Sequence, residues 1–132
     1  MIAKMVTTTF MTDKIDETRE FYVSKLGARL AFDCGWYISL EFGGPQLSVH
    51  FMSPQTPAHK LSHPDGLTFN IAVENVDSLH EKLTAGGGIA VDNPLASHPW
   101  GDRGFGIKDP NGISLYFYTE IEPDEYFSKC FK

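Results

Sequence analysis

The sequence predicts an α+β protein of two consecutive modules, each a strand, a helix and three further strands. The order of these elements repeats: Thr7 and Phe10 of the first module match Thr68 and Ile71 of the second at an offset of 61 residues. Apolar residues alternate in the predicted strands and recur at helical spacing between them. Clusters of Gly, Pro and Asn separate the segments. A chain of 132 residues can hold both modules as a single domain.

The first module is predicted over residues 5–52. A strand over 5–11 is followed by a helix over 14–26 with one apolar stripe, which Asp13 would cap and Gly27 would end. Three strands complete the module, and the last two are joined by a Gly-Gly-Pro turn. Their predicted ranges are 28–33, 36–42 and 46–52.

A linker over 53–66 contains three prolines and no apolar period. The second module, over 67–118, is predicted to begin with a strand at 67–73 and a helix that Asp77 caps. A short strand at 89–92 and a loop carrying His98, Pro99 and Trp100 lead to a final hairpin. The tail over 119–132 is either a short helix that clasps the domain or a partner chain, or a disordered end.

The final hairpin is the most informative stretch, because a turn motif and a strand pattern occur together. Asp109-Pro110-Asn111-Gly112 is typical of a tight turn. In the strand that follows, apolar side chains alternate with hydroxyl-bearing ones, so one face is predicted to be buried and the other polar. The apolar set is Ile113, Leu115 and Phe117, and the polar set is Ser114, Tyr116 and Tyr118.

Composition excludes several classes of partner. The net charge is −6 and no basic run is present, which argues against nucleic acid. No apolar run is long enough to cross a membrane, and no signal peptide is evident. Cys34 and Cys130 are too few for a disulfide framework and favour a reducing compartment, so a cytoplasmic location is expected.

Three stretches together resemble the vicinal oxygen chelate superfamily, which includes glyoxalase I, extradiol dioxygenases and the fosfomycin- and bleomycin-resistance proteins. They are FYVSKLGARLAF, SVHFM and RGFGIKDPNGISLYFY. The resemblance covers roughly residues 5–120 and implies the glyoxalase/bleomycin-resistance-like fold, with curved mixed sheets around a cleft. It also implies a homodimer.

The resemblance places metal ligands of the metal-dependent members at inner-face strand positions. In this chain those positions carry Thr7, Thr68, Tyr116 and either Ser48 or His50. Hydroxyl groups are poor ligands for a divalent ion, and one imidazole cannot hold it alone. The pattern is therefore closest to the metal-free bleomycin-resistance type, and no metal, cofactor or catalytic residue is expected.

We therefore expect a small-molecule-binding protein that sequesters a planar compound, neutral or cationic, without making or breaking a bond. Two alternatives stay open: a metal-dependent glyoxalase-like lyase or dioxygenase that recruits His50 with Glu41 or another carboxylate, and a dimeric domain whose site is vestigial. For both tryptophans, core packing is the alternative to ligand stacking. The predicted ligand-binding residues are Thr7, Trp36, Ser48, His50, Thr68, Asn70, Trp100, Tyr116 and Tyr118.

Overall fold

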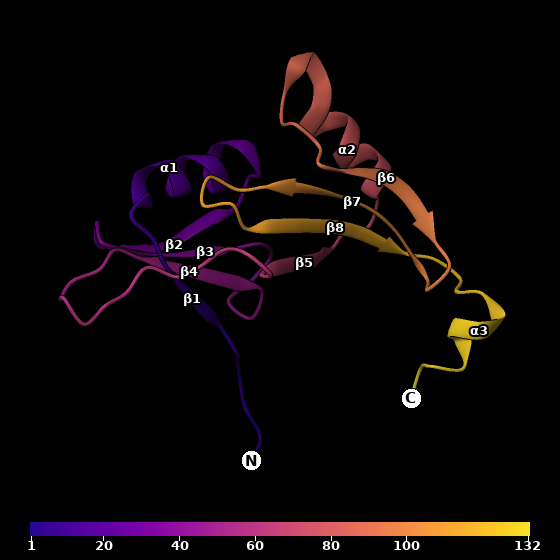
Figure 1. Ribbon diagram of the computed structural model, residues 1–132, viewed down its shortest axis with the longest axis horizontal. Coiled ribbons are helices and arrows are strands. Elements are labelled where there is room, and N and C mark those ends of the chain that lie inside the picture. The colour runs from indigo at the N-terminus through magenta and orange to yellow at the C-terminus, as the bar shows by residue number, and fades with distance from the viewer. The chain divides into compact units, whose positions relative to one another are not determined.

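The computed structural model describes residues 1–132 as two compact units, Met1–Pro64 (unit 1) and Asp65–Lys132 (unit 2). Each unit has a four-stranded mixed sheet, with a helix between the first and second strands (Figure 1). The predicted α+β class and the repeated strand-helix-strand-strand-strand order are thereby confirmed. The segment 53–67 between the two sheets contains no helix or strand.

In unit 1 the sheet order is β1-β4-β3-β2, with β1 parallel to β4 and the other pairs antiparallel. The predicted helix is present, but its second half is a π-helical turn. The first strand begins three residues later than predicted. The elements are β1 (Thr8–Met11), α1 (Ile15–Glu20), the π-helical turn Phe21–Lys25, β2 (Arg29–Asp33), β3 (Tyr37–Glu41) and β4 (Ser48–Met52).

The core of unit 1 forms where the helix covers the sheet. Phe51 and Tyr22 are fully buried, with ring centroids 5.3 Å apart, and Phe10 packs on Phe51 at 6.1 Å. Ile38 and Leu40 complete this layer from β3. Since side chains alternate along a strand, their neighbours Tyr37, Ser39, Thr9 and His50 lie on the opposite, uncovered face.

In unit 2 the sheet order is β5-β8-β7-β6, again with the first and last strands of the module parallel. None of the helices in the chain is both long enough and apolar enough to cross a membrane. The elements are β5 (Thr68–Ala72), α2 (Val76–Thr84), a 3-10 turn Ala85–Gly87, β6 (Asn93–His98), β7 (Asp102–Lys108), β8 (Ser114–Glu120) and α3 (Glu125–Ser128).

The hairpin β7–β8 is organised by its turn. Asp109 is buried, and its carboxylate accepts hydrogen bonds from the backbone N–H groups of Asn111 (2.8 Å) and Ile113 (2.9 Å). Gly112 has φ of +88°, which only glycine adopts without strain. The apolar face predicted for the second strand is confirmed, because its three apolar residues are buried with Phe105 and Ile107 of β7 beneath α2.

Both predicted helix caps are wrong. Asn75, not Asp77, precedes α2, and its side chain accepts a hydrogen bond from Ser78 N at 3.0 Å. Asp77 lies in the first turn and pairs with Arg103 at 2.8 Å. At α1 the N-cap residue is Lys14, which makes no side-chain cap hydrogen bond. Asn75 and Asp77 are both good cap residues, so the sequence pattern alone could not choose between them.

We predict that Asn75→Ala lowers the free energy of unfolding by about 1 kcal/mol, because it removes the acceptor for one of the free N–H groups of α2. Asp13→Ala, the matched change before α1, is expected to leave stability unchanged within about 0.5 kcal/mol. Urea denaturation of the two variants measures both values. Equal losses would show that the Asn75 cap adds nothing specific to α2.

The sixth strand lies later in the chain than predicted. Residues 89–92 form no strand, and β6 instead occupies Asn93–His98, within the stretch that the sequence predicts as a loop. Because β6 is an edge strand, it can hold a proline that lacks a ladder N–H. Its pairing with β7 is interrupted by a bulge between Asn93 and Ala96, and Pro94 lies within this bulge.

The C-terminal segment, residues 121–132, contacts the β6–β7 turn. The backbone N–H of Ile121 donates to Gly101 O at 2.9 Å, and that of Asp124 donates to Pro99 O at 2.8 Å. The Asp124 side chain then caps α3 through Phe127 N at 2.9 Å. Figure 1 shows α3 next to the β6–β7 end of the sheet in unit 2. The short helix expected in the tail is present as α3.

Candidate ligand-binding site

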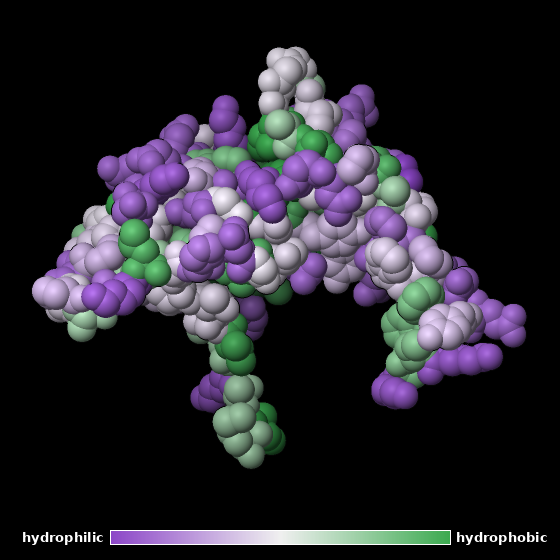
Figure 2. Space-filling view, viewed as in Figure 1, coloured by the Kyte–Doolittle hydropathy of each residue, from purple (hydrophilic) through white to green (hydrophobic).

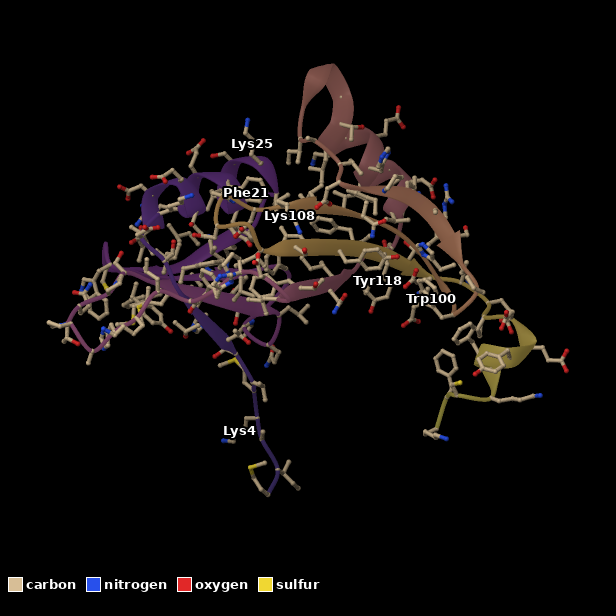
Figure 3. The ribbon with its side chains drawn as sticks, in the orientation of Figure 1. Lys4, Phe21, Lys25, Trp100, Lys108 and Tyr118 are labelled. Atoms are coloured by element: carbon tan, nitrogen blue, oxygen red, sulfur yellow. The ribbon has the colours of Figure 1, made fainter.

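The sheet of unit 2 has one face covered by α2 and one face that carries polar and aromatic side chains. On the uncovered face Asn70 of β5 is paired with Tyr116 of β8, and Asp102 of β7 is paired with Glu120. Figure 3 shows Trp100 at the β6–β7 turn and Lys108 at the other end of β7. We call this surface the open face of unit 2.

Asp102 is the centre of a hydrogen-bond network on the open face. Its Oδ1 accepts from the Tyr116 hydroxyl at 2.7 Å and lies 2.8 Å from His98 Nδ1, while its Oδ2 accepts from Trp100 Nε1 at 2.7 Å. The side chain of Asp102 is only 16% exposed. Three side chains from two strands and a turn are therefore fixed by one carboxylate.

The network also sets the ionisation of its members. Burial alone would raise the pKa of Asp102, but the hydrogen bonds from Tyr116, His98 and Trp100 outweigh it and hold that pKa below its ordinary value. Burial, followed by the adjacent Asp102 carboxylate, raises the pKa of Tyr116. At neutral pH the pair is thus a carboxylate and a neutral phenol, with the phenol as the donor.

Gly104 makes the Tyr116–Asp102 contact possible. A Cβ atom at this buried position would lie 2.6 Å from both Cζ and the hydroxyl oxygen of Tyr116, and 2.5 Å from Phe117 O. The Tyr116 ring therefore lies across the backbone of β7 where a side chain would otherwise stand. A residue without Cβ is needed here for space rather than for dihedral freedom.

Aromatic rings form the walls of a pocket of about 650 Å³ on the open face. The Trp100 indole stacks on His98 with a centroid distance of 4.4 Å and an interplanar angle of 4°, and Tyr116 stacks on Tyr118 at 5.9 Å. Trp100 and Phe127 form a T-shaped pair with a centroid distance of 6.3 Å. The pocket is lined by Asn70, Trp100, Gly101, Asp102, Tyr116, Tyr118, Glu120, Ile121, Pro123 and Phe131.

A second, more polar pocket of about 400 Å³ adjoins the first, because Asn70 and Tyr116 line both. Lys108 contributes the positive charge here, and its ammonium group lies 3.4 Å from Asp92 Oδ2. The remaining lining residues are Thr68, Asn93, Gly106, Ser114 and Leu115. The open face thus offers an aromatic, acidic region and a hydrogen-bonding region side by side.

Unit 1 carries a smaller network on its own uncovered face. The Tyr37 hydroxyl lies 2.7 Å from His50 Nδ1 and 3.2 Å from Thr9 Oγ1. Burial lowers the pKa of His50, which favours the neutral imidazole. On the same strand as Tyr37, Glu41 pairs with Arg29 at 2.8 Å. His50 is therefore held by a phenol and not by a carboxylate.

The structure brings together four of the predicted ligand-binding residues. Asn70, Trp100, Tyr116 and Tyr118 all line the larger pocket, and Thr68 lines the smaller one with two of them. The other four belong to unit 1: Thr7 precedes β1, Trp36 is 44% exposed before β3, Ser48 donates to Pro45 O at 2.9 Å, and His50 contacts Tyr37.

The sequence interpretation missed the central acid of the pocket. Asp102 and His98 were not included, and neither were Glu120 or the residues of the C-terminal segment. One signal was available: in the stretch from Asp102 to Gly106 every second residue is small or acidic, whereas Arg103 and Phe105 between them are large. Such alternation indicates a strand with one face kept open.

Comparison with known proteins identifies the family. Residues 4–117 match the model of the Glyoxalase/Bleomycin resistance protein/Dioxygenase superfamily. The chain belongs to this superfamily. The match confirms the superfamily predicted from the sequence motifs. No curated protein matches the sequence.

Solved structures of the superfamily share this fold. A glyoxalase/bleomycin resistance protein/dioxygenase from Nocardioides is 22% identical, with a TM-score of 0.74 over 94% of this chain and 87% of that chain. A superfamily member from Sphaerobacter thermophilus is 23% identical, with a TM-score of 0.70 and coverages of 90% and 98%. A lactoylglutathione lyase from Agrobacterium tumefaciens is 18% identical, with a TM-score of 0.70 and coverages of 89% and 94%.

The donor set of this superfamily member does not fit the divalent ion of the metal-dependent members. No group of three or more His, Cys, Asp or Glu side chains is arranged to hold a metal ion. The strand positions that the resemblance assigns to ligands carry hydroxyl groups and one imidazole, and that imidazole contacts Tyr37. Neutral hydroxyls are weak ligands for Zn²⁺, Fe²⁺ or Ni²⁺.

Proposed function

We propose that this superfamily member binds a small planar molecule in the larger pocket of unit 2, without a metal ion and without changing it chemically. The mechanism is sequestration of the bleomycin-resistance type. The observation that carries the proposal is the Asp102 network, because the less exposed of the two carboxylates of the pocket is the common acceptor for Tyr116, His98 and Trp100. The network fixes the Tyr116, His98 and Trp100 rings, two of which line the pocket.

The dimensions and lining of the pocket support this role. A volume of about 650 Å³ is within the range of small-molecule sites. Trp100, Tyr118 and Phe131 contribute aromatic rings to the lining, and the amide of Asn70 offers both a hydrogen-bond donor and an acceptor. A flat guest stacked on these rings gains roughly 0.5–1.5 kcal/mol per ring pair beyond area burial.

Two measurements test the proposal. Elemental analysis of protein purified without chelator should find no stoichiometric transition metal, because hydroxyl groups and one imidazole are weak ligands for such an ion. Thermal-shift screening of planar heteroaromatic compounds should raise the melting temperature, and addition of EDTA should not reverse the rise. A tightly held divalent ion at one per chain, or stabilisation only when metal is added, contradicts metal-free binding and favours a lyase or dioxygenase.

We also propose the homodimer that the resemblance implies. Unit 1 exposes several large apolar side chains, among them Phe32 at 54% and Leu47 at 60%. Figure 2 shows further hydrophobic residues on the N-terminal segment, where Ile2 and Val6 are exposed. A partner chain would remove such surface from water. Light scattering coupled to gel filtration distinguishes the 14.7 kDa monomer from a dimer.

A further inference from the structure

The family match ends at residue 117, yet half of the larger pocket is built from residues beyond it. These residues are Tyr118, Glu120, Ile121, Pro123 and Phe131. The other five lining residues come from β5, β7, β8 and the β6–β7 turn. What the pocket selects therefore depends in part on the end of β8 and on the C-terminal segment, which the superfamily pattern does not describe.

The base of this C-terminal segment is fixed. Two backbone hydrogen bonds join it to Pro99 and Gly101, as described above, and Phe127 contacts the Trp100 ring. A Cβ atom on Gly101 would lie 3.2 Å from Pro123 Cβ, so the proline packs closely on the glycine. The wall that starts at Pro123 is thus positioned by the same turn that carries Trp100.

The end of the segment is more open. The Phe131 side chain lines the pocket but is 68% exposed, and Cys130 N donates only to Phe127 O, within the segment itself. Figure 2 shows hydrophobic residues on the C-terminal segment that follows α3. An aromatic ring left open beside a pocket provides a contact surface for a flat guest.

The charged residues that line the larger pocket are all acidic. Its lining includes two carboxylates, Asp102 and Glu120, and no lysine or arginine. Asp102 already accepts from three side chains, whereas Glu120 is exposed and lies in no ion pair. The positive charge of Lys108 belongs to the smaller pocket and lies near Asp92. Glu120 is therefore the carboxylate available to a ligand.

We propose that the ligand of this pocket is a flat ring system with one positive charge, held against the faces of Trp100 and Phe131 with Glu120 as its counter-ion. Glu120 at the end of β8 and Phe131 of the C-terminal segment, together with Trp100, determine this selectivity. Ring faces attract cations as well as flat apolar surfaces, so the two parts of the site favour the same guest. The inference rests on the proposed function. It adds the charge of the ligand and the residues that recognise this charge.

The test uses three acridines of similar shape: 9-aminoacridine, which is a cation at neutral pH, uncharged acridine, and the anion acridine-9-carboxylate. Fluorescence titration of the full chain should give the order cation, neutral, anion from tightest to weakest. Glu120→Gln should weaken the binding of 9-aminoacridine about two- to fivefold, as expected for one exposed charge pair, and should change the binding of acridine less than twofold. Glu122→Gln removes a matched charge two residues further along the chain and outside the pocket lining. It should change the affinity for neither 9-aminoacridine nor acridine.

Phe131→Ala tests the contribution of the segment itself, and it should weaken both 9-aminoacridine and acridine about fivefold. Unchanged binding in this variant, or equal binding of all three acridines to the wild type, would overturn the inference while leaving planar binding intact. Binding of no acridine of any charge would instead remove the proposed function on which the inference depends. The two failures are therefore distinguishable.

Discussion

Asp102→Asn is expected to lower the free energy of unfolding at pH 7 by about 1–3 kcal/mol, because hydrogen bonds to a charged carboxylate are lost or weakened. The two carboxylate oxygens accept from Tyr116, His98 and Trp100. An asparagine offers one carbonyl oxygen, so its NH₂ group must face at least one of these donors. The stacked Trp100 and His98 rings would then lose their common anchor.

The stability that Asp102→Asn loses should become smaller as the pH falls. The pKa of Asp102 is lowered in the folded protein, so its stabilisation is complete above the unfolded value near pH 4 and disappears as the pH falls through the folded value. Urea denaturation at pH 7 and near pH 3 should therefore show a smaller gap between wild type and Asp102→Asn in acid. The exposed Asp13→Asn serves as the control. A gap that is the same at both pH values would show that ionisation of Asp102 is not what stabilises the network.

Gly104→Ala is expected to cost about 1–3 kcal/mol of stability, as overpacked sites do, and to move the Tyr116 ring. The added methyl group would lie 2.5 Å from Phe117 O, a backbone atom of the neighbouring strand, and 2.6 Å from the Tyr116 hydroxyl oxygen. Displacement of either oxygen atom costs free energy, because Phe117 is buried and the Tyr116 hydroxyl is hydrogen-bonded to Asp102. Thermal or urea denaturation measures the cost, and the affinity for 9-aminoacridine should fall with it.

Gly106→Ala is the matched control on the same face of the same strand. Its nearest neighbour would be Asn93 Cβ at 2.9 Å, on the edge strand β6, which has more freedom to shift than the central pair β7–β8. We expect a smaller loss than for Gly104→Ala. If the two alanine variants lose the same stability, the close approach of Tyr116 to Gly104 is not a special constraint.

The fold could be predicted where one pattern recurred over several residues. The alternation of Ile113, Leu115 and Phe117 after the Asp-Pro-Asn-Gly turn determined the hairpin and its buried face, and the structure agrees. The edge strand β6 could not be predicted in this way. An edge strand with a bulge needs neither alternation nor a full set of N–H donors, so its sequence is like that of a loop.

The candidate site was only partly predictable for a different reason. Asn70, Tyr116 and Tyr118 follow from alternation within strands that were recognised. Asp102 and His98 come together only through the pairing of β6 with β7, which joins residues across a turn that was predicted as a loop. The C-terminal wall of the pocket depends on contacts between Ile121 or Asp124 and the β6–β7 turn, and no local pattern encodes them.

The central claim is that the pocket of unit 2 holds a planar guest without a metal ion. The chain has two tryptophans, Trp36 in unit 1 and Trp100 in the pocket, so a ¹H–¹⁵N spectrum contains one indole N–H signal from each. Titration of EDTA-treated protein with 9-aminoacridine should shift the Trp100 signal and leave that of Trp36 in place. A shift of Trp36 alone, or no shift until a divalent metal is restored, would contradict the claim.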